Sequence, residues 1–140
     1  MSDIQYRNLG RNGVKVSPIT LGTMMFGGQT PDDVARRITD RALTANGYND
    51  GASEAVVGRL IGDRRQHWVL ATKFVNPNPG GSGPNNSGAS RQNVIASVDA
   101  SLKRLNTDYI DLFYLHREDH DTPVDETLRA LDDVLRAGTL

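Results

Sequence analysis

The sequence predicts an α/β protein in which helices cover a parallel β-sheet. Two observations lead to this prediction. Apolar stretches of strand length alternate along the chain with segments whose apolar residues recur at helical spacing. The stretch 68–74 is also continuously apolar up to its last residues, which is typical of a strand covered on both faces. Because crossovers between parallel strands are right-handed, we expect the carboxyl ends of all strands to lie on one side of the molecule.

The composition limits the possible classes of function. A chain of 140 residues can form one domain with a hydrophobic core. Its net charge of −1 gives no reason to expect binding to nucleic acid or to an anionic membrane. The absence of cysteine excludes disulfides and thiolate chemistry. The sequence contains neither a signal-peptide pattern nor an apolar run of transmembrane length, so we expect a cytoplasmic protein.

The first part of the chain predicts a hairpin and a strand. Residues 4–16 contain two short extended runs on either side of Asn12-Gly13, a strong signal for a tight turn between antiparallel strands. Residues 19–23 are predicted to form a buried strand that leads into a glycine-flanked loop. Further strands are predicted at 68–74 and 108–115, and the glycine- and proline-rich stretch 76–90 is predicted to be a long loop.

Four helices are predicted from residues that favour helix N-termini, followed by apolar residues at helical spacing. The expected N-caps are Thr30, Ser53, Ser90 and Thr122, and Gly62 and Gly138 are expected to end the second and fourth helices. The residues expected to face the sheet are Val34, Ile38 and Ala42, then Val56, Val57, Leu60 and Ile61, then Val94, Ile95, Val98, Leu102 and Leu105, and finally Val124, Leu128, Leu131, Val134 and Leu135.

Three side chains that can handle protons are predicted to meet at one edge of the sheet. Tyr48 lies between two turn-forming segments, just before the second helix. Lys73 lies at the carboxyl end of the strand 68–74, and His116 directly follows the strand 108–115. Ligands of barrels and of open α/β sheets bind at the carboxyl ends of strands. We therefore interpret Tyr48, Lys73 and His116 as candidate catalytic residues.

Each of the three also has a purely structural interpretation. Tyr48 could be an ordinary loop aromatic residue, Lys73 could pair with a carboxylate, and His116 could cap a helix or join a salt bridge. The convergence of three independent segments favours the catalytic interpretation. A metal site is conceivable around His116, Glu118, Asp119 and His120. It is disfavoured, because side chains at adjacent positions rarely satisfy the geometry of metal ligands.

A phenol, an ammonium group and an imidazole around one pocket suit the reduction of a carbonyl. Hydride that arrives at the carbonyl carbon builds negative charge on the oxygen, which then needs a proton donor and electrostatic support. A phenol ordinarily has a pKa near 10, and a neighbouring cation favours its ionised form. A histidine can hydrogen-bond the same oxygen. Since no side chain supplies hydride, a nicotinamide cofactor would have to provide it.

Several stretches resemble the aldo-keto reductase family, and the likeness runs through the whole chain. They are residues 6–10, 21–24, 44–54, 71–73, 101–105, 108–112 and 115–116. The resemblance implies a parallel (β/α) barrel of the TIM type with NADPH and a small-molecule carbonyl substrate at its carboxyl face. Only the first half of that barrel would be present, as a single partial domain over residues 1–140 with strand–helix units from about residue 19 to 138.

The resemblance also assigns roles to individual residues. Tyr48 would match the family's proton donor, Lys73 the lysine beside it, and His116 the histidine that faces the carbonyl oxygen. Gly22, Thr23 and Met24 would match the loop that lines the nicotinamide site.

The sequence departs from the family pattern in two ways: it stops after the fourth strand–helix unit, and it differs in the stretch before Tyr48. The family has an aspartate five residues before the tyrosine, and this position is Leu43 here. About eight residues, one strand in length, are also absent between Ala42 and Leu43. The alternative to a reductase is therefore an inactive barrel fragment that acts only through protein association. Open strand edges in such a fragment would favour self-association.

Overall fold

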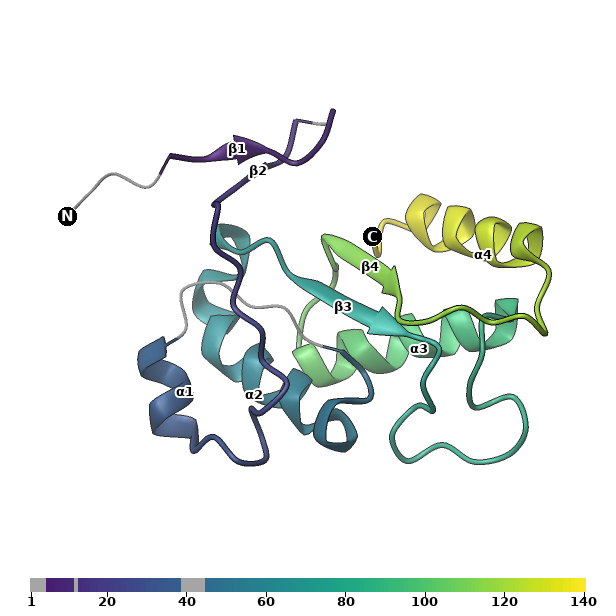
Figure 1. Cartoon of the computed structure of the whole chain (residues 1–140), viewed down its shortest axis with the longest axis horizontal. Coiled ribbons are helices and arrows are strands. Elements are labelled where there is room, and N and C mark those ends of the chain that lie inside the picture. The colour runs from purple at the N-terminus through teal and green to yellow at the C-terminus, as the bar shows by residue number, and fades with distance from the viewer. Residues whose placement is uncertain (1–4, 12, 39–44) are drawn as a thin grey trace.

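The computed structural model describes residues 5–11, 13–38 and 45–140 (Figure 1). Short strands, helices and two 3₁₀ segments follow one another along the chain. In order, they are β1 (Arg7–Asn8), β2 (Lys15–Val16), α1 (Asp32–Ile38), η1 (Tyr48–Gly51), α2 (Ala52–Ile61), η2 (Gly62–His67), β3 (Ala71–Phe74), α3 (Arg91–Leu105), β4 (Leu112–Leu115) and α4 (Val124–Arg136).

The N-terminal hairpin is confirmed. Strand β1 pairs antiparallel with β2, and Arg7 lies opposite Val16. Both strands are only two residues long and are largely exposed. Asn12 of the predicted turn lies outside the described residues. The hairpin is therefore a small appendage that lies apart from the main sheet (Figure 1).

The main sheet consists of β3 and β4, which pair in parallel as the alternation of strands and helices predicts. Lys73 lies opposite Tyr114, and Phe74 lies opposite Leu115. The prediction that the whole of 108–115 is a buried strand was wrong, because the strand covers only Leu112–Leu115 and its residues Tyr114 and Leu115 are 45% and 46% exposed. The reason is that β4 pairs only with β3 within the described part of the chain.

Within the described residues, the predicted buried strand at 19–23 is reduced to a single β-bridge residue, Gly22. In the described structure these residues belong to no strand of the main sheet, and Ile19 is 68% exposed. A strand needs a neighbouring strand to satisfy its backbone groups. The sequence analysis expects about eight residues, one strand in length, to be absent between Ala42 and Leu43, and these two positions lie outside the described residues.

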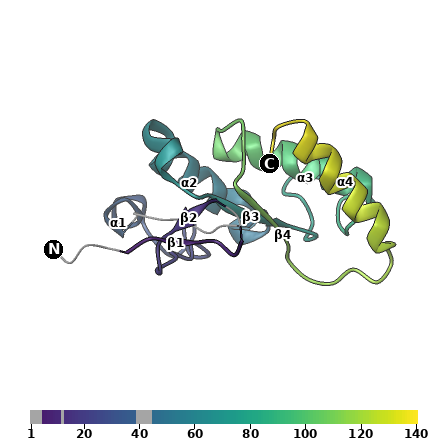
Figure 2. The same ribbon diagram turned by 90° about the horizontal axis from the view of Figure 1, so that it is seen from above.

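The helices α2, α3 and α4 lie along one face of β3 and β4 (Figure 2). Helices α2 and α3 approach closely because of Gly58, where an added Cβ would lie 2.3 Å from the Leu105 carbonyl oxygen. No helix in the described ranges has the length and apolar character needed to cross a bilayer. Buried apolar side chains around these helices form the core: Phe26, Ala35, Val56, Val57, Ile61, Trp68, Leu70, Leu105 and Ile110.

The predicted inward face of α4 was wrong in part. Val124, Leu128 and Leu135 are 72%, 59% and 57% exposed, whereas Ala130 and Val134 are buried. Helix α4 packs chiefly on α3. Its apolar positions therefore outnumber those that this single neighbour can cover, and an apolar stripe remains on the surface.

The predicted helix starts had mixed outcomes. Ser90 caps α3 by accepting a hydrogen bond from the Asn93 amide at 3.3 Å. Ser53 is not a cap, since α2 begins at Ala52 and the Ser53 hydroxyl donates to the Thr23 carbonyl at 2.7 Å. The cap of α4 is Pro123 rather than Thr122.

The predicted helix ends also had mixed outcomes. Gly62 does not stop the chain of turns, because the 3₁₀ segment η2 continues from it to His67. Gly138, with a φ of 78°, follows α4 and ends it as predicted.

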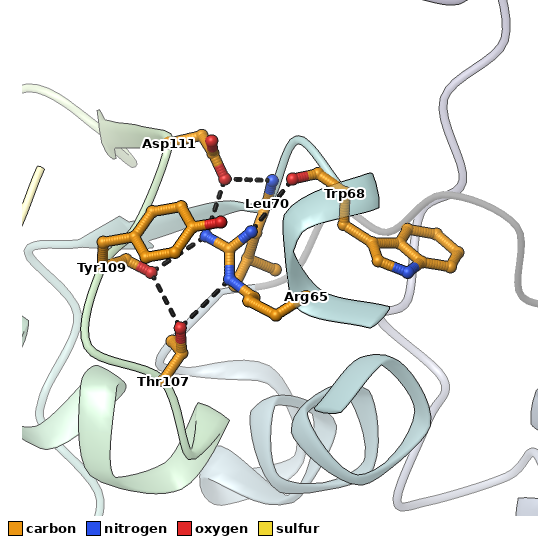
Figure 3. A network of polar contacts seen from close by, with 6 residues as sticks. All are labelled: Arg65, Trp68, Leu70, Thr107, Tyr109 and Asp111. Atoms are coloured by element: carbon orange, nitrogen blue, oxygen red, sulfur yellow. Dashed lines mark hydrogen bonds and ion pairs between the residues drawn. The ribbon is translucent and has the colours of Figure 1, made fainter. Parts of the chain in front are cut away.

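Arg65 joins the amino ends of the two strands of the main sheet (Figure 3). Its guanidinium donates to the Trp68 and Tyr109 carbonyls, each at 2.9 Å, and to the Asp111 carboxylate at 2.7 Å. The same carboxylate accepts from the Leu70 amide at 2.9 Å. The side chain of Arg65 is only 11% exposed and its Cζ lies 3.8 Å from the centre of the Tyr109 ring. One cation that is largely shielded from solvent thus fixes the amino ends of β3 and β4 relative to each other.

We expect Arg65→Ala to lower the free energy of unfolding by about 1–3 kcal/mol, because two partly buried carbonyls lose this donor and the Asp111 carboxylate keeps only the Leu70 amide. Urea unfolding followed by circular dichroism measures this change. The matched control is Arg64→Ala at the exposed neighbouring position, which should change the free energy by less than about 0.5 kcal/mol. Equal losses in the two variants would show that the network of Arg65 does not stabilise the sheet.

Candidate active site

Tyr48 begins the 3₁₀ segment η1, directly before α2. The turn that follows it has positive φ angles at Asn49, Asp50 and Gly51, residue types that adopt this conformation with little strain. The Asn49 side chain donates to the Met24 and Phe26 carbonyls at 2.7 and 2.9 Å. The loop of Tyr48 is therefore fastened to the loop 22–28.

Lys73 and Tyr48 are in direct contact. The Lys73 Nζ donates to the Tyr48 hydroxyl at 2.7 Å and lies 4.6 Å from the centre of the phenol ring. Lys73 comes from the carboxyl end of β3, as the sequence predicts. The carboxyl end of β3 and the loop of Tyr48 are thus joined by a hydrogen bond between these two side chains.

His116 follows β4 and continues its pairing, since its amide donates to the Phe74 carbonyl at 3.2 Å. Its ring meets the ring of Tyr48 edge to face, with centroids 5.7 Å apart and planes at 85°. The structure therefore brings together all three candidate catalytic side chains, from η1, β3 and the end of β4.

The surroundings of His116 favour its neutral form. Burial, the cation of Lys73 and the cation of Arg117, in this order, lower the pKa of His116 from its usual value. A neutral ring can donate one hydrogen bond and accept one. At neutral pH the uncharged form of the His116 ring therefore predominates.

The segment after His116 is held by Asp119. Its carboxylate accepts from the Ala89 amide at 2.6 Å and from the Thr122 hydroxyl at 2.8 Å. Hydrogen bonds from Ala89, Thr122 and the Asp121 amide, in this order, lower the pKa of Asp119. Asp119 thus acts as an anchor. Over the described ranges there is no group of three His, Asp or Glu side chains arranged to hold a metal ion.

The three candidate cofactor-binding residues, Gly22, Thr23 and Met24, differ in how far they are exposed to solvent. The Thr23 side chain is fully buried, and its hydroxyl lies 3.2 Å from the Ser53 hydroxyl. Gly22 is exposed, with no heavy atom within 4 Å of an added Cβ, and Met24 is 51% exposed. Gly22 and Met24 can meet a ligand, whereas Thr23 holds this loop onto α2.

The buried carboxylate of Glu54, which the sequence analysis missed, links β3 to the helix α2 that follows Tyr48. Glu54 is fully buried and accepts from the Thr72 hydroxyl at 2.6 Å and from the Arg104 Nε at 2.7 Å. The three residues come from α2, β3 and α3. The only signal in the sequence was an acidic residue in the first turn of a helix, which is common at any helix start.

The sequence analysis also missed three asparagines near the site, which are Asn78, Asn46 and Asn76. Asn78 is nearly buried and donates to the Asn93 side chain at 2.9 Å and to the Ser97 hydroxyl at 3.0 Å, while it accepts from Asn46 at 3.2 Å. The third, Asn76, lies 3.0 Å from the His116 ring. The start of the long loop 76–90 is therefore fixed to α3 and to the Tyr48 loop.

A cavity of about 560 Å³ separates the hairpin from the inner face of the sheet. Lys73 and His116 line it together with apolar side chains, and Tyr48 is not among its lining residues. The apolar lining comes from the N-terminal segment and from both strands: Tyr6, Leu9, Val16, Ile19, Val69, Ala71, Leu112, Tyr114 and Leu115. In a complete barrel this interior is filled by side chains from all eight strands.

Comparisons with known proteins agree with the fold. The sequence model of the Aldo/keto reductase family matches residues 18–140. The aldo-keto reductase AKR11C1 from Bacillus halodurans, in its holo form, superposes with a TM-score of 0.85 at 35% identity, over 98% of this chain and 48% of that chain. The chain belongs to the aldo/keto reductase family, and its fold is a part of that family's (β/α) barrel.

Curated relatives show the same partial coverage. The uncharacterized oxidoreductase YrpG of Bacillus subtilis is 40% identical over 152 positions, which span 96% of this chain and 47% of the relative. A probable voltage-gated potassium channel subunit beta of Arabidopsis thaliana is 39% identical over 147 positions, with 96% and 44% coverage. The chain thus spans about half the length of these relatives. Both alignments exceed its 140 residues, which supports the expectation that this chain lacks residues its relatives have.

We expect Lys73→Met to raise the pKa of His116, because it removes the cation with the larger effect of the two that oppose protonation of the ring. The lowered pKa means that His116 in the wild-type chain protonates only as the pH falls below its usual value of 6.5. Proton NMR titration of the His116 ring measures the shift. Arg117→Ala is the control and should give a smaller rise. A titration curve that Lys73→Met leaves unchanged would contradict the geometry of this site.

Proposed function

We propose that this chain carries the catalytic side chains of an NADPH-dependent aldo-keto reductase that reduces a small-molecule carbonyl compound. The observation that supports this proposal most strongly is the hydrogen bond of 2.7 Å between the Lys73 Nζ and the Tyr48 hydroxyl. Because the chain spans about half of its relatives, the proposal concerns a protein in which the remainder of the barrel is present. We also propose that the protein is located in the cytoplasm.

Tyr48 would donate its phenolic proton to the carbonyl oxygen as negative charge builds there. Lys73 would stabilise the phenolate that remains, and His116 would hydrogen-bond the same oxygen and orient it. NADPH, when bound, would supply the hydride. The exposed backbone of Gly22 and the side chain of Met24 are the parts of the candidate cofactor loop that would contact a nicotinamide ring. Thr23 would hold this loop in place through its contact with Ser53 of α2.

A second candidate role is protein association without catalysis. The exposed apolar residues Val124, Leu128 and Leu135 on α4 and the exposed edge of β4 favour it. A relative described as a probable potassium channel subunit beta is in line with such a role. It also agrees with the departure from the family pattern at Leu43, which lies outside the described residues. A completed barrel that binds NADPH but reduces no carbonyl compound would favour this role over the reductase.

We expect the isolated 140-residue chain to bind NADPH very weakly and to show negligible turnover, because it offers only the loop 22–24 among the expected cofactor contacts. Titration of NADPH fluorescence with the purified chain measures the affinity. Binding with a micromolar Kd would show that the cofactor site does not depend on the rest of the barrel.

The proton-donor role can be tested in a chimera that joins this chain to the part of Bacillus subtilis YrpG that it does not match. Tyr48→Phe should lower kcat for NADPH-dependent carbonyl reduction by about 10²–10⁴-fold and leave the Kd for NADPH unchanged, since only the acid is removed. Tyr109→Phe, at the opposite end of the strands, is the matched control and should keep full activity. Wild-type turnover in the Tyr48→Phe chimera would refute the role of Tyr48.

A further inference from the structure

Asn76 touches both sides of the candidate active site. Its Nδ2 lies 3.0 Å from the Nδ1 of His116. An added Cβ at Gly47, the residue before Tyr48, would lie 3.0 Å from the same Nδ2, so the amide packs directly against the Tyr48 loop. The backbone carbonyl of Asn76 accepts from the Asn46 side chain at 3.2 Å. Asn76 is therefore fixed between the loop of Tyr48 and the ring of His116.

The backbone before Asn76 is strained. Val75 has a φ of 93°, a conformation that is rare for a β-branched residue. Its side chain is buried, and its carbonyl accepts from the Gly88 amide at 2.9 Å. Strained residues of this kind persist where the surrounding structure fixes them, and they cluster at functional sites. Here the strain lies at the turn that takes the chain from β3 into Asn76.

The contact between the Asn76 side chain and the His116 ring determines which ring nitrogen can carry the proton. The Nδ2 of an asparagine only donates hydrogen bonds, so the Nδ1 of His116 must be the acceptor. A neutral imidazole that accepts at Nδ1 carries its proton on Nε2. We propose that Asn76 is a positioning residue that holds His116 in the Nε2–H tautomer, with Nε2–H as the donor left for a ligand. The catalytic meaning of this inference rests on the proposed function, whereas the tautomer itself does not.

Other groups around the ring are compatible with this assignment. The charged groups that act on His116 are Lys73 and Arg117, both cations, and they lower its pKa together with burial. An imidazolium would also present an N–H at Nδ1 to the amide N–H of Asn76, which is a repulsive contact. The ring lines the cavity of about 560 Å³, so a ligand there can reach it.

Long-range ¹H–¹⁵N NMR spectra of the labelled 140-residue chain report the tautomer directly. At about pH 8, where an ordinary histidine is neutral, the wild-type ring should carry its proton on Nε2. Asn76→Asp replaces the donor by a carboxylate acceptor and should shift the tautomer ratio toward Nδ1–H by at least about tenfold and raise the pKa of His116. The matched control is Asn86→Asp in the same loop, whose side chain binds the Asn78 carbonyl, and it should leave the ring unchanged.

A wild-type ring that carries its proton on Nδ1 would overturn the proposal, and so would an Asn76→Asp ring that matches the Asn86→Asp control. If Asn76→Asp does not fold, Asn76→Ala decides the matter, because the ratio of Nε2–H to Nδ1–H should then fall to that of a free histidine side chain. In the YrpG chimera, Asn76→Asp should lower kcat with little change in the Kd for NADPH. A shifted tautomer without loss of kcat would leave the tautomer assignment intact and count against the catalytic role of His116.

Discussion

The parallel pairing of β3 with β4 determines the geometry of the whole site. Its register sets Lys73 opposite Tyr114 and brings His116 directly after the last paired residue. A slip of one residue would turn the Lys73 side chain to the other face of the sheet. Phe74 and Phe113 stack at 4.7 Å between the strands, and Arg65 fixes their amino ends. Two of the three catalytic candidates thus owe their positions to four paired residues on each strand.

Tyr48 reaches the same place by a different route, because it lies on no strand. The buried Glu54 connects the helix after Tyr48 to Thr72, the residue next to Lys73. Breaking such a buried charged contact is costly, since a partner is left without compensation in the interior. The side chain of Asn46 adds a second link to the loop after β3. Polar contacts in the interior therefore position Tyr48, whereas backbone pairing positions Lys73 and His116.

Local patterns in the sequence were sufficient for some features and insufficient for others. Lys73 and His116 could be predicted because the carboxyl ends of parallel strands share one edge, a rule that needs only strand positions. The strand at 19–23, the burial of Leu115 and the inward face of Val124 and Leu128 were wrong for a common reason. Each assumed a neighbouring element that the described structure does not supply.

Asn76 and Glu54 could not be predicted, because their partners are distant in the sequence. Asn76 looked like one of several polar residues in a loop rich in glycine and proline. Only the fold shows that it faces His116, 40 residues away. Side chains that hold a catalytic group in place carry no local signature, in contrast to a strand end or a helix cap.

Half of a barrel is enough to bring Tyr48, Lys73 and His116 together in this structure. Nuclear Overhauser effects in the isolated 140-residue chain test it most directly. We expect cross-peaks between the Tyr48 ring and both the Lys73 ε-methylene and the His116 ring, alongside those of the stacked pair Phe74 and Phe113. A chain that shows the phenylalanine cross-peaks but none from Tyr48 would contradict the claim.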